Sequence, residues 1–209
     1  MPACATISGL VPAPRRDLCL EFANTRYWRG RPAPTEALSS FGALVEWCAA
    51  SGALDGAMAQ ALAAGCGDRG GEVYAGAIAL REAIWRIFAD CTAGAAPAVA
   101  DVDRLDRALS KAPVRRSIEP SGGGFAWRAE AVPAAVPGLL APVLWSAADL
   151  LLGPELGRVR SCANAECRWL FIDDSQAGTR RWCSMSACGN RAKAHRHYRR
   201  RRAAESVSG

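Results

Sequence analysis

Four cysteines near the C-terminal end of the chain are spaced as two short pairs. Four residues separate Cys162 from Cys167 and Cys183 from Cys188, and fifteen residues lie between the pairs. Zinc prefers four deprotonated ligands in a tetrahedron, and two such pairs joined by a hairpin's length of chain can converge on one ion without a large core. The spacing therefore predicts one structural Zn2+. Because all four ligands are cysteine, no position remains for a catalytic water.

The other five cysteines show no pairing, and we interpret them as core or incidental thiols. They are Cys4, Cys19, Cys48, Cys66 and Cys91. Ordinary buried thiols are also the competing interpretation for the clustered four. A disulfide framework is disfavoured because nine cysteines is an odd number and the Met1-Pro2-Ala3-Cys4 start lacks the features of a secretory signal. We expect a reducing compartment and a cytoplasmic, nucleoid-associated protein.

The residues around and after the second cysteine pair are strongly basic. Residues 158–209 hold 12 Lys and Arg against 4 Asp and Glu, whereas residues 1–157 hold 14 against 16. Four thiolates and one Zn2+ would leave a net charge of about +6 on the basic part, which favours a polyanionic partner. We predict a helix from about Met185 to Ala204, capped by Ser184 or Ser186. It lacks an apolar stripe beyond its first turns, so we expect an anionic partner to stabilise it.

DNA is the first hypothesis for that partner. Arginine and lysine would neutralise phosphates, while Asn190, Arg191 and His195 could reach base edges. A solvated basic tail is the alternative, but the run begins within three residues of a predicted zinc ligand, which favours nucleic-acid binding. The candidate nucleic-acid-binding residues are Arg180, Arg181, Asn190, Arg191, Lys193, His195, Arg196, Arg199 and Arg200.

The zinc-binding part is expected to fold as a treble-clef-like finger. Residues 169–172 are β-prone, residues 173–178 have turn chemistry, and residues 179–182 can return as a second strand. The second cysteine pair then opens the basic helix. A knuckle, a hairpin and a helix whose first turn supplies ligands is the treble-clef layout.

The preceding residues predict a mainly α protein with small β elements, an α+β class. Apolar periodicity favours helices over residues 35–50, 55–64, 72–93, 98–111 and 139–152. A Gly-rich loop between residues 114–118 and 125–128 predicts a β-hairpin, whereas residues 17–26 fit either a strand or a helix. We expect two domains, a helical regulatory domain over 1–157 and the zinc finger over 158–209. Prolines interrupt the most apolar stretch, 136–152, which disfavours a membrane span.

No catalytic residues are predicted, and we expect the protein not to be an enzyme. Residues 1–157 contain no P-loop, dinucleotide fingerprint or serine-nucleophile elbow, and both histidines, His195 and His197, lie in the basic segment. Two alternatives stay open: an enzyme for a small molecule with a purely structural finger, and an RNA-binding zinc module. The aromatic residues that could stack on RNA bases are Trp169, Phe171, Trp182 and Tyr198.

The sequence Cys188-Gly189-Asn190-Arg191, together with Trp169-Leu170-Phe171 and Arg181-Trp182-Cys183-Ser184-Met185, resembles the CGNR zinc finger family. The segment Leu20-Glu21-Phe22-Ala23-Asn24-Thr25-Arg26 is similar to the signature of the ABATE domain that accompanies this finger. The resemblance implies a bacterial, stress-induced transcription regulator that binds DNA. It also implies that the zinc ligands are Cys162, Cys167, Cys183 and Cys188.

The motif Asn24, Thr25 and Arg26 has two interpretations. It could form a ligand or partner site, and an unidentified small-molecule effector would fit a regulatory domain. The interpretation that we prefer is a structural corner, since Asn and Thr cap helices and Arg pairs with acidic neighbours.

Overall fold

Helices dominate the computed structural model, which describes residues 5–191. The helical elements are α1 (Leu18–Ala23), α2 (Phe41–Ala50), α3 (Gly56–Cys66), η1 (Gly67–Arg69), α4 (Gly70–Thr92), α5 (Val99–Leu109), α6 (Val136–Leu139), α7 (Ala141–Leu152), η2 (Pro154–Arg158) and η3 (Met185–Gly189). The strands are β1 (Thr6–Pro12), β2 (Arg26–Tyr27), β3 (Thr35–Glu36), β4 (Ser117–Ser121), β5 (Gly124–Pro133), β6 (Val159–Ser161) and β7 (Leu170–Ile172). These elements confirm the predicted α+β class.

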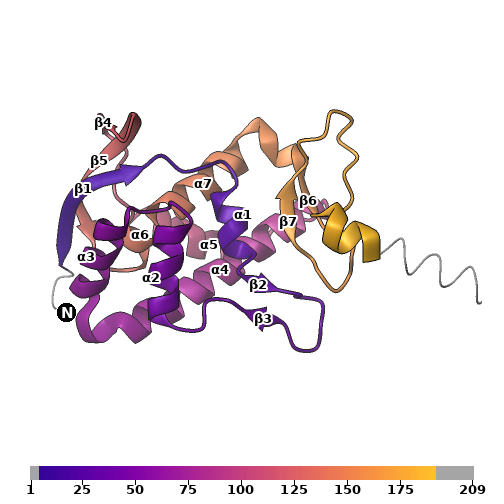
Figure 1. Cartoon of the computed structure of the whole chain (residues 1–209), viewed down its shortest axis with the longest axis horizontal. Helices are drawn as coiled ribbons and strands as arrows, with labels where there is room; N and C mark the ends of the chain where they lie inside the picture. The colour runs from indigo at the N-terminus through magenta and orange to yellow at the C-terminus, as the bar shows by residue number, and fades with distance from the viewer. Residues whose placement is uncertain (1–4, 192–209) are drawn as a thin grey trace, which may run out of the picture.

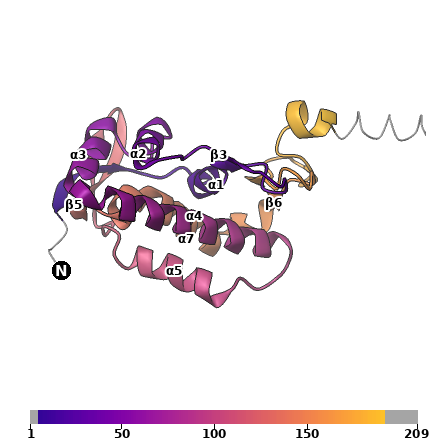
Figure 2. The ribbon, with the colours of Figure 1, turned by 90° about the horizontal axis from the view of Figure 1, so that it is seen from below.

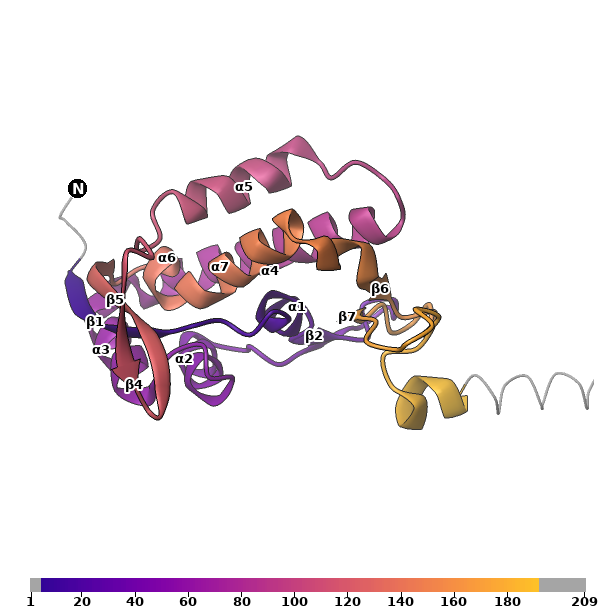
Figure 3. The same ribbon diagram turned by 90° about the horizontal axis from the view of Figure 1, so that it is seen from above.

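The helix α1 packs against both α4 and α7, and α5 packs against α4 and α7 on the side away from α1 (Figures 2 and 3). The helices α2 and α3 pack together near the sheet that holds β1. The strands β6 and β7 and the zinc-binding segment lie at the opposite end of the molecule from β4 (Figure 1). Within residues 5–191, no helix is long and apolar enough to cross a membrane.

Local sequence signals set most helix boundaries correctly. The predicted helix over 72–93 is α4, and α3 begins where Asp55 accepts a hydrogen bond from Met58 N at 2.8 Å. The predicted helix over 35–50 starts too early, because the Ser40 hydroxyl caps α2 at Ala43 N and residues 35 and 36 form β3 instead. The predicted helix over 139–152 is split at Leu140, next to the proline in the first turn of α7.

A three-stranded antiparallel sheet has the strand order β1-β5-β4. The predicted hairpin is present as β4 and β5, but β5 extends to Pro133, well past the predicted end at residue 128. The extra length pairs with β1, a strand that the sequence did not predict. Because β1 pairs with residues more than a hundred positions away, local sequence patterns do not predict this strand.

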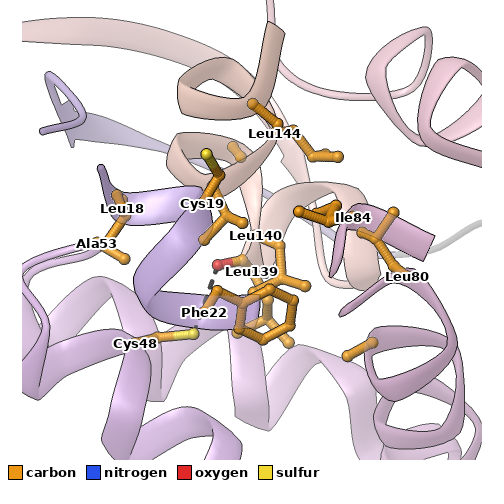
Figure 4. Packing of buried hydrophobic residues seen from close by; sticks show 14 of the residues in the cluster. Leu18, Cys19, Phe22, Cys48, Ala53, Leu80, Ile84, Leu139, Leu140 and Leu144 are labelled. Atoms are coloured by element: carbon orange, nitrogen blue, oxygen red, sulfur yellow. Dashed lines mark hydrogen bonds between the residues drawn. The ribbon is translucent and has the colours of Figure 1, made fainter. Parts of the chain in front are cut away.

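The core centres on α1, which packs against α4 and α7. Phe22, Leu80 and Ile84 meet there, as Figure 4 shows. The ambiguous segment 17–26 is therefore a buried helix followed by β2. Cys19 and Cys48 belong to this core, and burial raises the pKa of each thiol to about 12, so both stay protonated and unreactive.

Candidate metal centre

The four clustered cysteines bring their sulfur atoms together with the geometry of a zinc site. All four Sγ atoms lie within 4.8 Å of one another. The Sγ atoms of Cys167 and Cys183 are 3.7 Å apart, and those of Cys183 and Cys188 are 3.8 Å apart. A tetrahedron with Zn–S bonds of about 2.3 Å has sulfur–sulfur edges of about 3.8 Å. The cluster fits one structural Zn2+, and the donor set matches a soft thiolate-binding ion.

Short local turns position the first cysteine pair. Cys162 follows β6, and its backbone N–H donates to Trp169 O at 2.8 Å. Cys167 N donates to Asn164 O at 2.8 Å, and Arg168 then adopts a left-handed backbone with φ 54°. This tight knuckle turns both sulfurs toward one point.

The beginning of η3 positions the second pair. Ser184 is the N-cap, and its hydroxyl accepts from Ala187 N at 3.3 Å, which confirms one of the two predicted caps. Cys188 N donates to Ser184 O at 3.1 Å, so the ligand lies in the first turn of the helix. Gly189 is buried, and a Cβ there would lie 2.7 Å from Met185 Sδ, so a larger residue would displace the exposed Met185 side chain.

The clustered thiols shift one another's pKa. Hydrogen bonds from Cys167 and Cys183 hold the pKa of the Cys162 thiol well below its usual value, and the same hydrogen bonds to Cys162 raise the pKa of Cys167 and of Cys183. The Asn164 amide lies 3.6 Å from Cys188 Sγ and donates to it. Because zinc binds the deprotonated ligands, its affinity falls as acid protonates them.

Aromatic side chains close the site from outside. Phe171 is buried beside the sulfurs, and Trp28, Trp169 and Trp182 pack around it. Four sulfur ligands under such a cover leave no open coordination position, which is the arrangement of a structural zinc site.

Two sequence families match the chain over its two parts. Residues 16–154 match ABATE, described as "Putative stress-induced transcription regulator", and residues 158–201 match the CGNR zinc finger. The chain belongs to the ABATE family. No curated protein matches it. The two matches, in this order, confirm the resemblance noted in the sequence, and the ABATE family and its CGNR finger indicate a regulatory role.

The CGNR finger differs from the predicted hairpin. Strand β7 pairs with β6, so the prediction that residues 179–182 return as its partner strand is wrong. Asp173 explains the difference: its carboxylate accepts from Ser175 N, Ser175 Oγ and Arg180 N at 2.6–2.9 Å and ties the loop back. Arg181 O then accepts from Ala163 N at 2.9 Å, which places the returning chain against the knuckle. The hydrogen bond from Ser175 lowers the pKa of Asp173.

Four of the candidate nucleic-acid-binding residues lie exposed on the finger. They are Arg180, Arg181, Asn190 and Arg191. The guanidinium groups of the three arginines lie over aromatic rings. The guanidinium carbon of Arg180 lies 4.5 Å from the centre of the Phe171 ring. The corresponding distances are 5.5 Å from Arg181 to the Trp182 ring centre and 4.8 Å from Arg191 to the Trp28 ring centre. The other predictions lie outside the described residues, namely Cys4, the continuation of the basic helix past residue 191, Lys193, His195, Arg196, Tyr198, Arg199 and Arg200.

The motif Asn24, Thr25 and Arg26 lies where the ABATE domain meets the finger. The Asn24 side chain donates to Leu170 O at 2.8 Å and accepts from Leu170 N at 3.0 Å, so it pairs with β7 as a strand would. The Thr25 hydroxyl donates to Phe22 O at 2.8 Å. Arg26 is half-exposed and reaches Glu82 at 3.4 Å. The contacts of Asn24 and Thr25 are those of a structural corner that docks the finger.

A buried charge network beside this corner was not predicted. Arg81 is only 1% exposed, yet its guanidinium donates to both Glu36 oxygens at 2.5 and 2.6 Å and pairs with Glu82 at 2.9 Å. Arg29 also pairs with Glu82 at 2.6 Å, while its Nε is buried without a partner among the described residues. The signal in the sequence was a charged residue at position 81 within the apolar face of α4, between Ala77 and Ile84.

Proposed function

We propose that this protein is a DNA-binding transcription regulator in which the zinc ion fixes the start of a basic segment. The observation that carries the proposal is the change from buried to exposed at the end of the finger. Cys188 and Gly189 are buried at the metal cluster, whereas Asn190 and Arg191, the next two residues, are exposed. The zinc site therefore determines where the basic segment begins.

The charge of the chain supports a polyanionic partner for this end. The CGNR part and the residues after it carry 12 Lys and Arg against 4 Asp and Glu, whereas the ABATE part is slightly acidic. Phosphate contacts would then dominate the affinity, and specificity would come from the few side chains that reach base edges.

Duplex DNA is favoured over RNA by the state of the finger's aromatic residues. Phe171 is only 8% exposed and Arg180 covers its ring. Trp169 is half-buried and stacks on Tyr27 with ring centres 5.5 Å apart. Rings already stacked within the protein are poorly placed to stack on splayed bases.

In this proposal the ABATE domain regulates DNA binding, and no residue has a catalytic role. The name of the family implies a bacterial stress response, and we place the protein in the cytoplasm, where its DNA target would be. An effector for the ABATE domain is part of this proposal.

Fluorescence anisotropy with a labelled random duplex tests the function. We expect the logarithm of the association constant to fall linearly with the logarithm of salt concentration, with a slope of about −0.9 per phosphate contacted. Competition with single strands and structured RNA should leave most duplex bound. An association constant that does not change with salt concentration, or the absence of duplex binding, would refute the proposal.

The variant Cys183→Ser separates zinc-dependent binding from general attraction to a basic tail. Loss of one ligand should remove bound zinc and weaken duplex binding at least tenfold, because the metal organises the start of the basic segment. Cys48 lies in the buried core, away from the metal cluster, and provides a control. The variant Cys48→Ala should retain one bound zinc and the wild-type affinity for the duplex. An unaltered affinity of zinc-free Cys183→Ser would count against the zinc-dependent mechanism.

A further inference from the structure

The loop that joins β2 to β3 in the ABATE domain, residues 28–34, lies against the zinc knuckle (Figure 1). Gly30 N donates to Glu166 O at 3.0 Å. A Cβ on Gly30 would lie 1.8 Å from Ala165 O, so this close approach requires glycine. Arg31 Nε donates to the Glu166 carboxylate at 2.9 Å. Pro32 and Pro34 follow and restrict the backbone, so the loop is stiff where it meets the finger.

Two arginines from different parts of the chain contact the Trp28 ring. The guanidinium carbon of Arg31 lies 4.2 Å from the centre of the Trp28 ring, and that of Arg191 lies 4.8 Å from it. Trp28 has φ 54°, a left-handed conformation that aromatic residues rarely adopt, so the packing around its side chain must hold it there. We name Arg31, Trp28 and Arg191 the arginine–indole stack.

The arginine–indole stack keeps an uncompensated charge at the surface. Glu166 accepts from Arg31 and lies 3.8 Å from Arg191, so one carboxylate serves two guanidinium groups. The side chains of Arg31 and Arg191 are 38% and 53% exposed. A guanidinium stacked on a ring retains N–H groups along its edge, and their planar fork matches the oxygens of a phosphate. The stack is therefore shaped and charged to bind a phosphate.

We propose that the arginine–indole stack is a phosphate-binding part of the nucleic-acid interface, to which the ABATE domain contributes Arg31. Trp28 acts as the positioning residue for both arginines. The inference rests on the proposed DNA-binding function and extends it, because one duplex then contacts the finger and the 28–34 loop together. A shift of this loop would change DNA affinity, which gives the ABATE domain a direct route to regulation.

Salt titrations of Arg31→Gln and Arg31→Lys test the inference. If Arg31 contacts one phosphate, Arg31→Gln should reduce the magnitude of the log–log salt slope by about 0.9. The ratio of wild-type to variant affinity should then shrink by about 3.5-fold as salt rises from about 50 to 200 mM. Arg31→Lys keeps the charge, so it should retain the wild-type slope even where the absolute affinity falls.

The variant Arg115→Gln is a matched control. Arg115 also lies near two indoles, with its guanidinium carbon 5.9 Å from the Trp127 ring centre and 5.6 Å from that of Trp145, and it pairs with Asp149 at 2.7 Å. It lies two residues before β4, and β4 is at the end of the molecule opposite the finger (Figure 1). Loss of an arginine–indole contact there should leave the salt slope unchanged.

Zinc content and Tm, measured for each variant, separate binding from stability. A wild-type slope in Arg31→Gln, with or without a lower Tm, would show that the stack only clamps the finger and would overturn the inference while leaving the proposed function intact. Absence of duplex binding by the wild-type protein would remove the proposed function and the inference together.

Discussion

A single polar side chain, that of Asn24, connects the ABATE domain to the finger. Asn24 is polar and buried, and both of its amide hydrogen bonds go to the backbone of Leu170 in β7. The sequence marked the residue through the Asn-Thr-Arg motif but left its role open. Its two partners lie 146 positions away, so local sequence could not have chosen between a ligand site and a structural corner.

We predict that Asn24→Ala destabilises the protein by about 2–4 kcal/mol, because a buried N–H and a buried C=O lose their partner. Urea unfolding followed by circular dichroism measures the change. Asn190→Ala, at an exposed position, should change the free energy of unfolding by less than about 0.5 kcal/mol. A similarly small change for Asn24→Ala would contradict the docking role of this side chain.

Glu82 predicts a dependence of stability on acid pH. Burial alone would raise its pKa, but hydrogen bonds and charges from Arg29 and Arg81 outweigh burial and hold the pKa below its ordinary value. A carboxylate with a lowered folded-state pKa stabilises the protein above its unfolded pKa of about 4.3, and this contribution is lost as pH falls through the folded-state value.

The free energy of unfolding should therefore decrease between about pH 5 and pH 3, and less steeply in Glu82→Gln than in the wild type. Parallel urea titrations across this range give the two slopes. Zinc content measured for both proteins at each pH separates zinc release from the titration of Glu82. Identical slopes would show that Arg29 and Arg81 do not perturb this carboxylate.

Elements formed by local sequence were predicted well, and elements formed by distant pairing were not. The apolar face of α4, the start of α3 next to Asp55 and the cap Ser184 follow from periodicity and side-chain chemistry. Strand β1 and the pairing of β6 with β7 depend on partners elsewhere in the chain, and turn residues such as Asp173 override β propensity. The zinc ligands were predictable because metal coordination requires a fixed residue type at short, countable spacings.

The 28–34 loop offers a prediction at the level of elements. Gly30→Ala would bring a Cβ to 1.8 Å from Ala165 O, so the loop must move away from the knuckle, at a cost of about 1–3 kcal/mol. Gly71→Ala, in the first turn of α4 with open space around its Cα, should instead stabilise the protein by up to about 1 kcal/mol. Thermal unfolding of both variants checks the opposite signs. A stabilising Gly30→Ala would contradict the close approach of loop and knuckle.

At the scale of the whole molecule, the finger and the ABATE domain share one hydrophobic core. Val159, Leu170 and Ile172 of β6 and β7 belong to the same buried cluster as α1 and α4. The division at residues 157 and 158, expected from the change in charge, stays a prediction about domains. Composition reveals such a change, but it does not reveal that side chains from both parts pack together.

Zinc removal should consequently destabilise the entire protein. We predict one cooperative thermal transition whose midpoint falls by several degrees in chelator, since the first ligand pair lies between β6 and β7, strands that contribute residues to the core. Calorimetry with and without chelator measures this. Two separate transitions would show that the finger unfolds by itself, provided that the midpoint of the larger one is the same with and without chelator.

The central claim is that a four-cysteine zinc site organises the DNA-binding end of the chain. Its most direct test is the anisotropy of a labelled duplex while zinc is returned stepwise to metal-free protein. The predicted result is binding that recovers in proportion to added zinc and saturates at one equivalent per chain. Duplex affinity that is the same at zero and one equivalent would contradict the claim.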